Sequence, residues 1–158
     1  MIKLVLMAVF MLLCIFSGLA AEAFFKSRAA VINDFLSFIR YAKRETEFLK
    51  TDVESLMEDY SAGGEFKAIL DKALTDIRAG KKAECTSERL KKEARAEISA
   101  FFNGLTECDY YSKDALFGYS EAAAEELKQN AEKELKQKGE LIKKLMFLLG
   151  VGLVVLLI

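Results

Sequence analysis

Residues 32–60 read INDFLSFIRYAKRETEFLKTDVESLMEDY, and this stretch decides the class of fold. Its apolar side chains recur at gaps that alternate between three and four residues, a spacing that only a helix keeps on one face. The positions are Ile32, Phe35, Ile39, Ala42, Leu49, Val53, Leu56 and Tyr60, with Thr46 interrupting the series. The pattern predicts one long helix in the core of a bundle. Its seven-residue repeat leaves open a homo-oligomer formed through a coiled coil.

Further helices are predicted downstream of this one. The glycine pair at 63–64 is expected to end the first helix, and a second is predicted over residues 66–77, closed by Gly80. A third is predicted from residue 86 or 87 to the Asn-Gly pair at 103–104, burying Leu90, Ala94, Ile98, Phe101 and Leu105. A capping turn at 106–109 then starts a last helix that reaches Ile142 and the C-terminal tail. No strand-like alternation competes with this pattern, so an antiparallel helical bundle is expected.

The two ends of the chain are apolar and the middle is charged. Residues 4–21 and 145–158 carry no charge, so 46 of the 47 charged residues fall in 22–144. As a helix the first run reaches about 27 Å and the second about 21 Å, against a hydrocarbon core of about 30 Å. Leu141 and Ile142 lengthen the second run if Lys143 and Lys144 snorkel to the interface. We predict an N-terminal transmembrane anchor over 1–22, a helical bundle over 23–143, and a transmembrane or membrane-dipping anchor over 144–158.

A cleavable signal peptide is the alternative at the N-terminus. Lys3 supplies a minimal basic region, and Ala-Glu-Ala at 21–23 resembles a cleavage site. The apolar run is longer than the core of a usual signal peptide, however, and continues into Phe24 and Phe25 without a break. These features favour a retained anchor. For the C-terminal run the alternative is a tail buried in the core, but no solvated face is present, which favours the membrane.

The basic residues beside the apolar runs indicate an orientation. They are Lys26, Arg28, Lys136, Lys138, Lys143 and Lys144. Lys3 is the only basic side chain beyond the anchors, so the positive-inside rule predicts a cytoplasmic bundle with both termini on the far side of the membrane. A cleaved signal peptide would reverse this orientation and export the bundle.

The composition excludes several classes of function. The chain has no histidine, which rules out Ser-His and Cys-His catalysis and most zinc sites. No glycine-rich phosphate loop is present, and 22 basic against 24 acidic residues in 22–144 argue against nucleic-acid binding. We therefore predict no enzyme activity, no catalytic residue, no cofactor and no metal. The three scattered cysteines suit a reducing compartment, although a disulfide between Cys85 and Cys108 stays possible.

Two motifs carry a family resemblance. The first is Phe101-x-x-x-Leu105-Thr106-x-x-Asp109, and the second is Lys143-Lys144-Leu-Met-Phe147-Leu-Leu-Gly150-Val-Gly152-Leu. Their sequences and the distance between them resemble those of the stage III sporulation protein AB family of endospore-forming bacteria. The chain departs from the family pattern at Phe102 and Thr106, where glycine is common, at Lys113, where glutamine is common, and by lacking a Thr-Pro pair after Tyr41.

The resemblance implies a helical bundle similar to the cytoplasmic domains of the type II secretion inner-membrane platform protein. It also implies a non-enzymatic role in the channel complex between mother cell and forespore, with the protein in the mother-cell membrane that surrounds the forespore. The expected partners are the membrane, a secretion-type ATPase and other stage III channel proteins. The resemblance assigns no residue to the ATPase contact.

Overall fold

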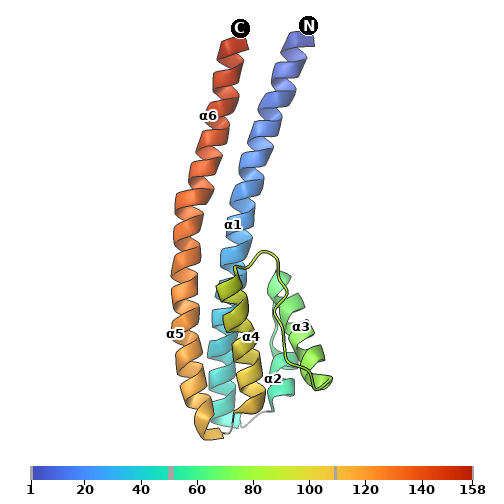
Figure 1. Cartoon of the computed structure of the whole chain (residues 1–158), viewed down its shortest axis with the longest axis vertical. Coiled ribbons are helices and arrows are strands. Elements are labelled where there is room, and N and C mark those ends of the chain that lie inside the picture. Colours follow the sequence, from blue (N-terminus) through green and yellow to red (C-terminus); the bar gives the residue numbers. More distant parts are fainter. Residues whose placement is uncertain (1, 50–51, 109, 158) are drawn as a thin grey trace. The chain divides into compact units, whose positions relative to one another are not determined.

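The computed structural model describes residues 2–49, 52–108 and 110–157. No strand occurs among them, which confirms the predicted all-α class. The elements in chain order are α1 (Ile2–Leu49), α2 (Val53–Asp59), α3 (Gly64–Arg78), α4 (Lys92–Glu107), α5 (Tyr110–Glu134), the π-helical turn η1 (Leu135–Gly139) and α6 (Glu140–Leu157) (Figure 1). The chain forms two compact units. We call residues 30–129 the bundle unit, and residues 1–29 with 130–158 the paired-helix unit.

A cluster of phenylalanine rings forms the core of the bundle unit. Phe101 of α4 lies at its centre, with its ring centroid 5.5 Å from that of Phe35 on α1 and 6.1 Å from that of Phe117 on α5. Phe66 of α3 joins the cluster through Phe38, at a centroid distance of 6.0 Å. All five side chains are buried. The predicted apolar faces of the first three helices therefore meet in one core, as expected for a bundle.

The predicted single helix over residues 32–60 is wrong in its second half. α1 ends at Leu49, and α2 begins at Val53. Between them Asp52 has an extended backbone (φ −65°, ψ 147°), and its carbonyl accepts the Leu56 N–H at 3.0 Å to start a new helix. The apolar spacing survives because Leu56 still packs into the core, but from a separate helix.

The predicted bounds of the third helix are also wrong. α4 begins at Lys92, five residues or more after the expected start, and continues through the Asn-Gly pair to Glu107. The stop signal failed because the Asn103 side chain bonds to a different segment. Its Oδ1 accepts the Ala83 N–H at 2.8 Å, and its Nδ2 donates to the Ala83 carbonyl at 3.1 Å. Ser99 adds a second tie, since its hydroxyl accepts the Cys85 N–H at 2.9 Å. Residues 83–85 are thereby held against α4 without forming a helix.

Replacing Asn103 with alanine is expected to release this segment. The amide of Ala83 loses its acceptor, so its hydrogen exchange should become about tenfold faster, in line with the loss of one net hydrogen bond. The matched variant is Ser99→Ala, which should affect the Cys85 amide instead. Exchange measured by mass spectrometry or NMR would check both. We call the two hydrogen bonds between Asn103 and Ala83 the Asn103 clamp. Unchanged hydrogen exchange at the Ala83 amide in Asn103→Ala would contradict this clamp.

The paired-helix unit consists of two antiparallel helical segments. Figure 1 shows them side by side, with the N- and C-termini at the same end of the unit. A Cβ placed on Gly18 would lie 3.4 Å from the Lys143 Cα, and one on Gly150 would lie 3.4 Å from the Cys14 Cβ. Both distances correspond to ordinary van der Waals contact, so Gly18 and Gly150 lie on the faces where the two segments pack against each other. Extended along the chain, this register puts Leu157 about level with Leu6, so the C-terminal run accompanies nearly the whole N-terminal one.

A π-helical turn precedes the C-terminal apolar helix. It spans Leu135–Gly139, where an α-helix was predicted to continue, and it leaves Gly139 buried with Phe25 of α1 beside it. A π-turn adds one residue to a helical turn and so rotates the helix beyond it. The four-residue steps from Ala131 to Leu135 and Gly139 therefore stay on the face that meets α1.

Candidate functional site

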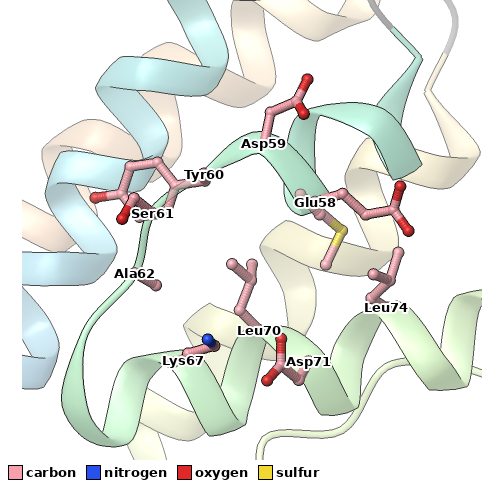
Figure 2. Close-up of a pocket in the computed structure, with 10 residues that line it drawn as sticks. Glu58, Asp59, Tyr60, Ser61, Ala62, Lys67, Leu70, Asp71 and Leu74 are labelled. Carbon is pink, nitrogen blue, oxygen red and sulfur yellow. The ribbon is translucent and has the colours of Figure 1, made fainter.

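A groove between α2 and α3 is the candidate binding site of the bundle unit. It has a volume of about 500 Å³ and is lined by Met57, Glu58, Asp59, Tyr60, Ser61, Ala62, Lys67, Leu70, Asp71 and Leu74 (Figure 2). Figure 2 shows Leu70 projecting from α3 toward the opposite wall. Met57 and Leu70 are buried beneath the groove, so most of the surface that it exposes comes from its polar lining residues. We call it the α2–α3 groove.

The end of α2 and the segment after it form one wall of this groove. After α2, Tyr60 has an extended backbone, and the Ala62 N–H donates to its carbonyl at 2.8 Å. The Tyr60 ring lies 5.0 Å from that of Phe38 and 5.1 Å from that of Tyr41, measured between centroids. Burial raises the pKa of the Tyr60 phenol, and the Asp34 carboxylate adds to this, so the phenol stays protonated at neutral pH. The wall is therefore fixed to the aromatic core.

The rim of the groove is acidic. Glu58, Asp59 and Asp71 supply three carboxylates against the single ammonium of Lys67. Arg78 partly offsets this charge nearby, since it pairs with Glu58 and, at 3.1 Å, with Glu54. Those carboxylates raise the pKa of Arg78, and the largest cause is the hydrogen bond that Arg78 donates to Glu58. A mainly polar groove with an acidic rim suits a basic segment of a partner.

The structure brings four of the expected juxtamembrane cations into ion pairs, namely Arg28, Lys138, Lys143 and Lys144. Arg28 is buried and lies 2.8 Å from Glu134, and Lys143 lies 2.7 Å from Glu22, each distance joining nitrogen to carboxylate oxygen. Lys26 and Lys144 remain exposed. The Arg28 pair was not predicted from sequence, although Arg28 stands four residues before Ile32, on the same apolar face.

The family-motif positions do not form one site. Phe101 and Leu105 are buried in the bundle unit, whereas Gly150 contacts Cys14 in the paired-helix unit. Phe147 and Gly152 are exposed, and Asp109 lies outside the described residues. All three cysteines are free thiols, so Cys85 and Cys108 form no disulfide. Within the described ranges no cluster of three or more acidic or cysteine side chains could hold a metal.

The groove and the Asn103 clamp were both missed from sequence. The groove depends on the separate helix α2, and the apolar spacing, which continues past Thr46 to Tyr60, gives no sign of a break at Asp52. A weak sign of the Asn103 clamp is present in the sequence. Asn103 stands four residues after Ser99, and two such side chains on one helix face can bond to a neighbouring segment.

Comparison with models of known protein families identifies the family of this chain. The family model described as stage III sporulation protein AB matches residues 3–158. The chain belongs to this family. Membership supports a role in sporulation. No curated protein and no solved structure matches the chain significantly.

Part of the structure is suited to a membrane. By length and composition the stretch Ala8–Thr46 of α1 could cross a bilayer, with a mean hydropathy of 2.1 in its most apolar window. Only 11% of that window is buried, whereas the core helix of a soluble protein would be mostly buried. A signal sequence passes the same test of length and composition.

Proposed function

We propose that this protein is a non-enzymatic membrane platform in the mother cell–forespore channel that engages a secretion-type ATPase. The observation that carries the proposal is the family match over residues 3–158. The family resemblance supplies the channel and the ATPase, and the two-unit structure supplies a physical basis for a platform. One unit presents apolar side chains to its surroundings, and the other presents charged ones.

The paired-helix unit supports a membrane placement. Its exposed side chains include Phe16, Leu13, Leu148 and Val155, each more than half exposed. In water such a surface is unfavourable, whereas in lipid it replaces water contacts with apolar ones. The antiparallel register lays the two apolar runs side by side, which supports a common depth for them in a membrane. This favours two anchors, over 1–22 and 144–158, with the intervening residues 23–143 on one side of the membrane.

The basic residues favour the cytoplasmic side for the bundle. In cells that produce the fusion proteins, alkaline phosphatase fused after residue 70 is expected to be inactive. β-Galactosidase fused at the same position is expected to be active. A fusion after residue 158 provides the reference for the far side. Active alkaline phosphatase at residue 70 would contradict the platform and favour an exported module with a cleaved signal peptide.

The α2–α3 groove is our proposed contact for the ATPase. Its acidic rim favours a basic segment of the partner. The groove is rigid on one side because Tyr60 packs on Phe38 and Tyr41. A preformed site of this kind loses little conformational entropy on binding.

Charge reversal at the rim tests this contact. In the full chain, Asp59→Lys combined with Asp71→Lys is expected to weaken capture of the ATPase about tenfold or more and to reduce its dependence on salt. Glu107→Lys combined with Asp114→Lys is the control, since these acids are exposed outside the groove. Biolayer interferometry with the chain in detergent would measure both. No capture by the wild type would contradict the platform, whereas capture unaffected by rim reversal would contradict only the groove.

A further inference from the structure

A second groove lies on the surface of the paired-helix unit. It has a volume of about 220 Å³ and is lined by Ile15, Leu19, Lys143, Lys144 and Phe147. Ile15 and Leu19 come from α1, and the other three residues come from α6. The groove therefore joins two helices of the same unit, with three apolar side chains and two lysines.

The two lysines differ in how closely each pairs with an acidic side chain. The ammonium of Lys143 lies 2.7 Å from a Glu22 carboxylate oxygen. Lys144 lies 3.9 Å from Glu140, at the outer limit of an ion pair, and its side chain is 74% exposed. At that separation and exposure an ion pair adds little. Lys144 thus retains a positive charge that a stronger anion can take.

The antiparallel register sets the direction of the groove. Leu19 lies about level with Lys144, and Ile15 lies about level with Leu148, roughly 6 Å further along the apolar run at 1.5 Å per residue. The groove thus starts at the lysines, where the charged part of the chain ends, and extends into the uncharged segment. A lysine in that position reaches back to the interface with its ammonium group.

From this arrangement we infer that the groove seats one anionic phospholipid. The phosphate lies against the Lys144 ammonium, and one acyl chain lies along Ile15, Leu19 and Phe147. Basic side chains at the edge of membrane helices bind anionic headgroups in this way. The inference rests on the proposed membrane placement of the paired-helix unit. A zwitterionic lipid fits the apolar part equally well but gains less from Lys144.

The experiment uses the full chain in detergent, with phosphatidylglycerol and phosphatidylcholine as probes in native mass spectrometry. The wild type is expected to retain phosphatidylglycerol in preference, and Lys144→Ala is expected to lose about fivefold of that preference. Lys136→Ala is the control, because that exposed lysine lies outside the groove. Leu19→Trp, which fills the groove, should reduce retention of both lipids. Leu12→Trp, on exposed surface elsewhere, should not.

Four results would overturn the inference. Equal retention of the two lipids by the wild type would do so, as would a preference that survives Lys144→Ala. A Leu19→Cys variant that cross-links quantitatively to a second copy in membranes would show that a protein helix fills the groove. In each of these cases the membrane placement would stand. If the chain is instead found outside the membrane fraction of cells, the placement itself fails and the lipid site fails with it.

Discussion

Replacing Phe101 with alanine is expected to destabilise the full chain by about 3–5 kcal/mol. The side chain is 1% exposed and contacts rings from α1, α4 and α5, including Phe35, Phe102 and Phe117. Removing it deletes apolar burial and leaves a cavity that several surrounding helices cannot all close. Phe101→Leu keeps most of the volume and should cost clearly less.

The matched control for this prediction is Phe147→Ala. Both phenylalanines are family-motif positions, but Phe147 is 53% exposed and lies in the paired-helix unit. Its replacement should shift the unfolding midpoint of the bundle unit by less than a fifth of the Phe101 effect. Urea unfolding in detergent, followed by the circular dichroism of the tyrosines and phenylalanines, would measure both variants. Equal midpoints for Phe101→Ala and the wild type would contradict the central place of Phe101 in the core.

The core was predictable because burial follows helical spacing. Ile32, Phe35 and Ile39 recur at the period of a helix, and all three are buried. Their spacing depends only on local geometry, which a sequence records directly. The same reasoning found the buried Phe101 and Leu105 on α4, so the helical class and most of the apolar faces followed from the sequence.

The α2–α3 groove could not be predicted in the same way. An apolar period continues from Ala42 to Leu56, and nothing in it distinguishes one helix from two. The break depends on the extended backbone of Asp52 and on packing of Met57 and Leu70 into the core, which are tertiary effects. The Asn103 clamp likewise joins residues 20 apart in sequence. Propensity rules treat asparagine as a helix stop because they count only local bonds.

In the paired-helix unit, the apolar segments could be predicted from the sequence, but their register could not. Its apolar runs were evident from composition, and their lengths gave the expected spans. The register was not evident, since it depends on which small residues face the partner helix. Gly18 and Gly150 do so, whereas Gly152 is exposed. Only the structure distinguishes these three glycines.

Breaking the pair of Arg28 and Glu134 is the second large effect expected. The side chains are 10% and 17% exposed, and they lie 2.8 Å apart. Arg28→Leu leaves the Glu134 carboxylate half-buried with Lys138 at 3.4 Å as a remaining cation, and should cost about 3 kcal/mol. Glu134→Leu leaves the Arg28 guanidinium buried without this carboxylate. It should lower the free energy of unfolding by about as much or more. Arg40→Leu is the control, because the Arg40 side chain is 51% exposed beside Glu121 and Glu125, where solvent screens the pairs and their loss costs much less.

The double variant, Arg28→Leu with Glu134→Leu, separates a paired charge from two independent contacts. It should be more stable than either single variant, since replacing both charges by apolar groups removes the cost of burying one alone. Strictly additive losses of stability in unfolding by urea would contradict the pairing.

The pair of Arg28 and Glu134 also opposes slippage of the two helical segments. Sliding one segment by a helical turn would bring Lys138 opposite Arg28 and remove Lys143 from Glu22, so both changes raise the electrostatic energy. The two ion pairs therefore favour the observed register over this shifted one.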